Sequence, residues 1–105
     1  MRAMVRDGGE VELVGRLDVR GAAAAREALH EALARGEGDL VVDLSGVELV
    51  DATGLGVLVD VHRRAGLAGR RLVLRNASPR VARLLAITRL NRVLAVESAG
   101  VAVPA

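Results

Sequence analysis

The chain has no cysteine and no aromatic residue: Cys, Trp, Tyr and Phe are all absent. The lack of cysteine excludes disulfides, thiol nucleophiles and thiolate metal sites. The lack of aromatic rings removes the usual stacking platforms for single-stranded nucleic acid. The core must therefore be built from Val, Leu, Ile and Ala, whose small volumes favour helices that lie close against a sheet.

Strong charge of one sign is also missing. All 15 basic residues are Arg, and 13 acidic residues leave a formal net charge of only +2. The acids are interleaved with the Arg residues, and adjacent Arg pairs occur only at 63–64 and 70–71. This pattern is more typical of an ordinary solvated surface than of a nucleic-acid groove. We therefore expect no direct nucleic-acid partner.

Length and hydropathy suit one small domain. A chain of 105 residues that is 51% hydrophobic can bury one core but has no room for a second. Neither the apolar run of a signal peptide nor the roughly 18 apolar residues of a membrane span is found. The sequence predicts one cytoplasmic domain over 1–105, without membrane insertion, with its core at about 4–96 and a short tail at 97–105.

Strand and helix patterns alternate in the order β-β-α-β-α-β-α-β. Asp7-Gly8-Gly9 favours a hairpin turn, and Leu40–Val42 is typical of a buried strand. Ser78-Pro79 signals a helix start with Ser as the N-cap. The order predicts an α/β fold, a mixed four- to five-stranded sheet packed with about three to four helices. The residues expected to face the sheet are Ala22, Ala25, Leu29, Ala32 and Leu33 in the first helix, Gly54, Val57, Leu58, Val61 and Ala65 in the second, and Val81, Leu84, Leu85 and Thr88 in the third.

The segment 41–59 carries most of the functional information. Its pattern predicts a buried strand, a short polar turn organised by Asp43 and Ser45, and the start of an amphipathic helix. Thr53 stands where that helix begins. A helix N-terminus has unpaired N–H groups and a positive dipole end, which suit a capping hydroxyl or a phosphate attached to it. From these residues alone, Thr53 is an N-cap, a modification site, or both.

Three segments match a known family in order along the chain: Gly15–Asp18, Asp43–Val59 and Ala77–Leu85. Through them the chain resembles the bacterial anti-sigma factor antagonists of the STAS domain family. The resemblance implies a partner that is both an anti-sigma factor and a Ser/Thr kinase, and it implies phosphorylation of the residue before Gly54, here Thr53. It also implies that the unphosphorylated antagonist binds this partner so that a sigma factor is freed for transcription in a stress response, and that a phosphatase resets the cycle.

We expect the partner to bind around Thr53. Gly56 and Asp60 share its side of the helix. A missing side chain at an exposed Gly56 would let a partner approach closely, and the alternative is tight packing against a neighbouring loop. Asp18 and Asp51 are expected to hold the flanking loops and contact the kinase, rather than to act in acid–base or metal chemistry. The complete expected partner-binding set is Asp18, Asp51, Ala52, Gly54, Leu55, Gly56, Asp60 and Ser78.

Two other functions stay open at this point. One is a STAS accessory subunit bound to the ATPase of a lipid-type ABC transporter, because such subunits share the fold. The other, less favoured, is a small enzyme working from Asp18, Asp51 and Thr53. His30 and His62 fall in different helices without ligand-type neighbours, so no metal or other cofactor is expected. The chain is expected to be a monomer or weak dimer.

Overall fold

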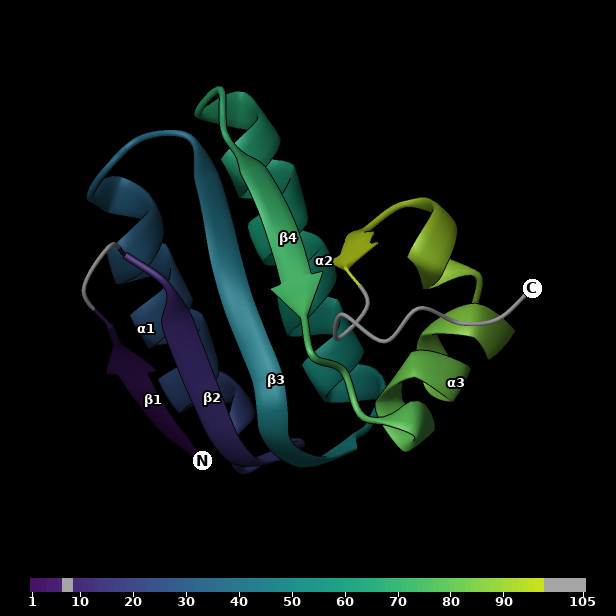
Figure 1. Ribbon diagram of the computed structural model, residues 1–105. Coiled ribbons are helices and arrows are strands. Elements are labelled where there is room, and N and C mark those ends of the chain that lie inside the picture. Colours follow the sequence, from purple (N-terminus) through teal and green to yellow (C-terminus); the bar gives the residue numbers. More distant parts are fainter. Residues whose placement is uncertain (7–8, 98–105) are drawn as a thin grey trace.

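The computed structural model describes residues 1–6 and 9–97 as a five-stranded sheet with three α-helices and one short 3-10 helix (Figure 1). The α/β class and the order of the elements are confirmed. The predicted turn residues Asp7 and Gly8, and the tail from residue 98 onward, lie outside the described residues. The elements in chain order are β1 (Arg2–Val5), β2 (Val11–Leu17), α1 (Ala22–Ala34), β3 (Asp39–Val50), α2 (Ala52–Leu67), β4 (Arg71–Arg75), α3 (Pro79–Ile87), the 3-10 helix η1 (Leu90–Arg92) and β5 (Ala95–Glu97).

The sheet has the order β1-β2-β3-β4-β5. β1 is antiparallel to β2, and every later neighbour pair is parallel. Parallel neighbours need a crossover connection, which α1, α2 and α3 with η1 supply in turn. In Figure 1, α1 and α2 lie behind the sheet, while α3 lies to one side of it. The carboxyl ends of β2 and β3 therefore meet at one edge, where α1 and α2 begin.

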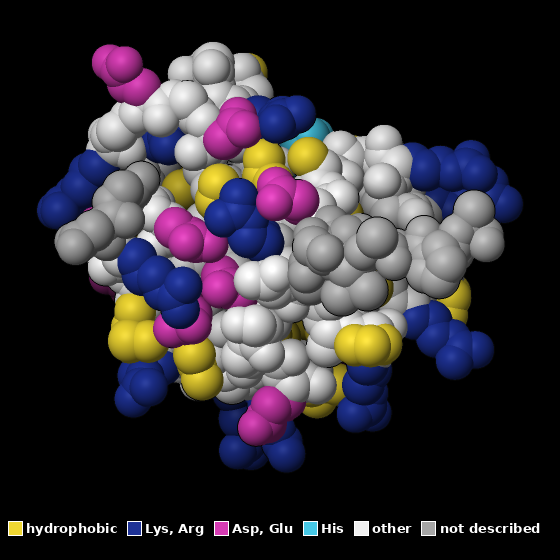
Figure 2. All heavy atoms as spheres, in the orientation of Figure 1, with side chains coloured by type: hydrophobic (Ala, Val, Ile, Leu, Met, Phe, Trp, Pro, Cys, Tyr) yellow, Lys and Arg dark blue, Asp and Glu magenta, His cyan; other side chains and the backbone are white. Residues whose placement is uncertain are grey.

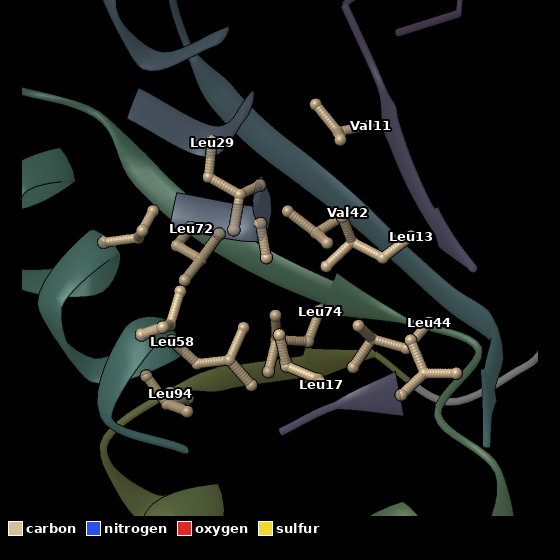
Figure 3. Close-up of a cluster of buried hydrophobic side chains, with 14 of the residues drawn as sticks. Val11, Leu13, Leu17, Leu29, Val42, Leu44, Leu58, Leu72, Leu74 and Leu94 are labelled. Carbon is tan, nitrogen blue, oxygen red and sulfur yellow. The ribbon is translucent and has the colours of Figure 1, made fainter. Parts of the chain in front are cut away.

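The hydrophobic core lies between the sheet and the pair α1 and α2. Figure 3 shows Leu29 of α1 and Leu58 of α2 beside sheet residues such as Leu72 and Leu74, all of them fully buried. The predicted inner faces of α1 and α2 are confirmed, except that Leu33 is only partly buried. In α3 the buried residues are Val81 and Leu85.

The prediction that Thr88 points into the core is wrong. Thr88 is exposed, and its hydroxyl donates to the carbonyl oxygens of Leu84 at 2.8 Å and Leu85 at 3.2 Å. It is the last residue of the α3 region, the C-cap, where carbonyl groups lack helical partners. A hydroxyl at this position satisfies backbone groups instead of filling the core.

β3 is longer than the sequence predicted. It continues through Val50, across the segment assigned to a polar turn. Within the strand, Asp43 Oδ1 accepts a hydrogen bond from the Ser45 N–H at 2.8 Å. The register with β2 shifts between Glu12 and Val14, opposite these residues. Asp43 and Ser45 thus organise an irregularity inside the strand, because side-chain-to-backbone bonds that make turns also make bulges.

No helix in the described part of the chain has the length and hydropathy needed to cross a membrane.

Candidate functional site

Two loops lie side by side at the carboxyl ends of β2 and β3. Leu17 and Val50 are register partners, so the next residues, Asp18 and Asp51, begin these loops together. The Asp51 N–H donates to the Leu17 carbonyl oxygen at 3.3 Å, which ties the second loop to the end of β2. The structure therefore places both aspartates at the loops beside the start of α2, and their contact with a partner stays a prediction.

Asp51, and not Thr53, is the N-cap of α2. Its backbone is extended and its Oδ1 accepts a hydrogen bond from the Gly54 N–H at 2.9 Å. Thr53 is the second residue of the helix, and it is exposed. The prediction of Thr53 as a cap is wrong because Asp is the better capping residue and stands two positions earlier. The Thr53 hydroxyl is therefore not needed to start the helix.

Asp18 holds the neighbouring loop in the same way. Its Oδ1 accepts hydrogen bonds from the N–H groups of Arg20 and Gly21, each at 3.0 Å. The Gly21 bond is the largest influence and, with the Arg20 bond and nearby Arg charges, it outweighs desolvation and lowers the pKa of Asp18. Both aspartates thus accept hydrogen bonds from backbone N–H groups: Asp18 from the loop before α1 and Asp51 from the first turn of α2. Over residues 1–6 and 9–97, no group of three or more His, Asp or Glu residues could hold a metal ion.

Two glycines in the first turns of α2 have opposite surroundings. Gly54 is buried, and a Cβ at that position would lie 2.0 Å from the carbonyl oxygen of Leu17. Gly56 is exposed, and a Cβ there would meet no atom within 4 Å. Tight packing therefore explains Gly54 and does not explain Gly56. Gly54 lets the start of α2 pack against the end of β2, while Gly56 lies on the surface beside Thr53.

Asp60 lies on the side of α2 that faces α1, and its carboxylate links the two helices. Its carboxylate contacts His30 Nε2 and Arg64 Nε, each at 3.1 Å, and Arg63 at 3.3 Å. Burial alone would raise the pKa of Asp60, but the hydrogen bonds from His30, Arg63 and Arg64 and the Arg64 charge lower it overall. The prediction that His30 lacks a ligand-type neighbour is wrong, because the packing of α1 against α2 joins residues far apart in sequence.

The remaining predicted site residues fall into two groups. Ala52 is exposed and Leu55 is partly buried, so both lie next to Thr53 on the first turn of α2. Ser78 belongs to a different strand-to-helix connection. Its Oγ accepts from the Val81 N–H at 3.2 Å and caps α3, with Pro79 as the first helical residue, as predicted.

The fold and site together define a class of protein: a small α/β domain that presents a capped helix start and an exposed hydroxyl on its surface. The chain belongs to the STAS domain family. The family model described as "Mlab, STAS domain" matches residues 1–97, which confirms the resemblance inferred from the sequence.

Proteins of known name support the same assignment. The chain is 36% identical over 89 residues to the anti-sigma-B factor antagonist of Bacillus subtilis (strain 168), covering 85% of this chain and 81% of that protein. It is 32% identical over 87 residues to the anti-sigma-B factor antagonist of Staphylococcus aureus (strain NCTC 8325 / PS 47), covering 83% and 81%. The crystal structure of an anti-sigma factor antagonist from Mycobacterium paratuberculosis matches with a TM-score of 0.75 and 27% identity, covering 90% and 83%. These relatives are named for a regulatory role, in agreement with the prediction that the chain is not an enzyme.

Proposed function

We propose that the chain is an anti-sigma factor antagonist that binds an anti-sigma factor with Ser/Thr kinase activity and is switched off by phosphorylation at Thr53. The observation that carries this proposal is the division of labour at the start of α2. Asp51 caps the helix, and Thr53 is exposed one turn before Gly56, which is exposed and has no side chain. A hydroxyl that the fold does not use for capping is available for modification.

The proposed partner surface consists of the exposed first turns of α2 and the loop beside them. Thr53 lies at its centre, with Gly56 exposed and open to close approach. Ala52 and Leu55 are neighbouring contacts, and Asp18 and Asp51 form the acidic rim. Two members of the predicted set support the surface instead of forming its centre: Gly54 by packing and Asp60 by its bonds to α1. Ser78 caps α3, so we do not include it in this surface.

Phosphorylation would change the charge of this surface without changing the fold. The γ-phosphoryl group of ATP is transferred to the Thr53 hydroxyl oxygen, the hydroxyl proton is lost and ADP leaves. The phosphate adds about −1.5 to −2 charge at pH 7. It stands at a helix N-terminus, where free amides and the dipole favour an anion. A partner surface shaped for a neutral hydroxyl beside two aspartates would reject the same charge.

The partners in this cycle are the kinase, which is also the anti-sigma factor, and a phosphatase that removes the phosphate. The cycle would take place in the cytoplasm, where sigma factors meet RNA polymerase. Each encounter is controlled at one residue, so the output is a change in sigma-factor-dependent transcription.

The test is to incubate the protein with an anti-sigma factor kinase of its own genome and ATP, and to locate the phosphate by mass spectrometry. We expect one phosphate on Thr53 and none on Thr53→Ala. Ser45→Ala is the matched control, because Ser45 is also an exposed hydroxyl but lies on β3. Phosphate on Ser45 or Ser78 with Thr53 unmodified would overturn the site. Copurification with a transporter ATPase and no kinase would favour the ABC-transporter subunit instead.

A further inference from the structure

One end of the fold carries a net positive charge that no acidic residue of the same segment offsets. Residues 76–96 contain four Arg residues and no Asp or Glu, whereas the other eleven Arg residues share the chain with all 13 acids. The four are exposed: Arg80 and Arg83 in α3, and Arg89 and Arg92 around η1. Over α3 and η1, on the right of Figure 2, dark blue side chains occur without magenta ones.

These four Arg residues differ from Arg71 and Arg75 of the sheet in their pairing. On the sheet, Arg71 pairs with Asp39 at 3.0 Å and Arg75 pairs with Glu97 at 3.1 Å. In the described part of the chain, none of the four cations on α3 and around η1 lies within ion-pair distance of a carboxylate. With no carboxylate partner among residues 1–6 and 9–97, their guanidinium groups can bind carboxylates of another molecule.

An apolar groove of about 230 Å³ lies between α3 and the end of β3. It exists because β3 continues through Val50, whereas its last pairing with β4 is at Asp43. α3 lies over the uncovered part of the strand. Arg80 and Arg83 line the groove. The apolar lining residues are Leu49, Val50, Val81, Leu84 and Ile87.

One face of α3 combines the two features. Arg80, Arg83, Leu84 and Ile87 follow the spacing i, i+3, i+4, i+7, so they share a side of the helix. This side adjoins the core side, which carries Val81 and Leu85, and Val81 also lines the groove. Ile87 is 70% exposed and lies at the C-terminal end of this face, where it adds apolar surface beside the two Arg residues.

We propose that this groove is a second docking surface, which binds an acidic amphipathic segment of a partner protein. Apolar side chains of the segment would enter the groove beside Leu84 and Ile87. Its carboxylates would pair with Arg80 and Arg83, whose planar guanidinium groups bind carboxylates through two parallel hydrogen bonds. Arg89 and Arg92 extend the positive field and steer the segment toward the groove. This surface is additional to the one around Thr53.

The groove favours a protein segment over the other anionic classes. A nucleic acid would meet Arg residues but would have no aliphatic side chains to fill an apolar groove, and the chain has no aromatic residue on which bases could stack. A lipid bilayer is a broad surface and does not enter a groove of this size. An amphipathic segment provides both apolar side chains and carboxylates at helical spacing.

The test uses the full chain and a labelled synthetic peptide of about 16 residues, which is long enough for about four helical turns. The peptide carries Leu at i, i+3, i+4 and i+7 with Glu on both flanks, and binding is measured by fluorescence anisotropy. We expect Arg80→Glu/Arg83→Glu to weaken binding about tenfold or more, and Ile87→Ser to weaken it severalfold. A peptide with Lys in place of Glu should prefer the double variant to the wild type.

The matched control is Arg2→Glu/Arg26→Glu, which makes the same charge change at two exposed sites on β1 and α1. It should keep most of the binding. All substituted side chains are exposed, and thermal unfolding checks that each variant is folded. Equal loss in both double variants would show a net-charge effect and overturn the proposal. Stronger binding of anionic phosphatidylglycerol vesicles or a single-stranded DNA oligonucleotide, lost in Arg80→Glu/Arg83→Glu, would also overturn it.

A Thr53→Glu variant separates the two surfaces. Val50, which lines the groove, is three residues before Thr53, so this variant tests whether a negative charge at the start of α2 reaches the groove. Peptide affinity within about twofold of the wild type supports an independent groove, because the effects of independent sites add. A loss comparable to that of Arg80→Glu/Arg83→Glu would show a single site and overturn the second docking surface. Failure of the groove experiment would leave the phosphorylation of Thr53 unaffected, since that is measured with kinase and ATP.

Discussion

Gly54 and Gly56 are two residues apart on α2, yet they face opposite environments. The inner glycine has the Leu17 carbonyl oxygen where a side chain would begin, and the outer glycine has open space. The first is therefore explained by the fold and the second is not. An exposed helical Gly is less favourable than Ala by about 1 kcal/mol, so Gly56 is a stability cost on the face that carries Thr53. The comparison separates residues that pack the start of α2 against β2 from residues that form the exposed surface around Thr53.

Gly54→Ala should produce the largest effect on stability. A Cβ 2.0 Å from a backbone oxygen forces α2 away from the end of β2. Overpacking of this kind destabilises by about 3 kcal/mol or prevents folding. Urea unfolding followed by circular dichroism measures the loss. An unfolding midpoint equal to that of the wild type would show that the start of α2 and the end of β2 are not as closely packed as described.

Asp51→Ala should have the next largest effect, a loss of about 1 kcal/mol from removal of the α2 N-cap. Thr53→Ala is the matched control on the same turn, and we expect it to change the free energy of unfolding by less than about 0.5 kcal/mol. Thermal or urea unfolding of both variants makes the comparison. A larger loss of stability in Thr53→Ala than in Asp51→Ala would show that Thr53, and not Asp51, caps α2.

Gly56→Ala should change stability and binding in opposite directions. The free energy of unfolding should rise by about 0.5–1 kcal/mol, because Ala is the better helix former and nothing blocks its side chain. Affinity for the kinase should fall, since the added methyl group keeps the partner from Thr53. Calorimetric titration with the kinase tests this. Unchanged affinity would remove Gly56 from the partner surface.

The smallest expected effect is a change in the pH dependence of stability in Asp18→Asn. The pKa of Asp18 is lowered in the folded chain, chiefly by the Gly21 amide. Its contribution to stability is therefore complete above the unfolded pKa of about 3.9 and is lost as pH falls through the lower folded value. Asp18→Asn cannot titrate, so its melting temperature should fall less steeply below about pH 4 than that of the wild type. Parallel melting curves across this pH range would contradict the assignment.

The fold could be predicted well because its signals are periodic. The inner face of α2 was identified from spacing, and all five of its members are buried. The Ser78-Pro79 helix start was equally specific, and the structure shows the cap. Patterns of this kind depend on one element facing one core, which sequence spacing records directly.

The features that the sequence did not reveal depend on contacts between elements or on competition between neighbours. Thr53 and Asp51 both had the chemistry of a cap, and only the backbone geometry distinguishes them. The bond between His30 and Asp60 needs the packing of two helices. The polar residues Asp43 and Ser45 indicated a local backbone bond correctly, but the strand continued through it.

The most direct test of the central claim compares the affinity of the phosphorylated and unphosphorylated protein for the same kinase. We predict that phosphate on Thr53 weakens binding about a hundredfold, which corresponds to about 2.7 kcal/mol, while the far-ultraviolet circular dichroism spectrum stays unchanged. Equal affinity of the two forms, with the phosphate located on Thr53, would contradict the claim that this hydroxyl switches the interaction.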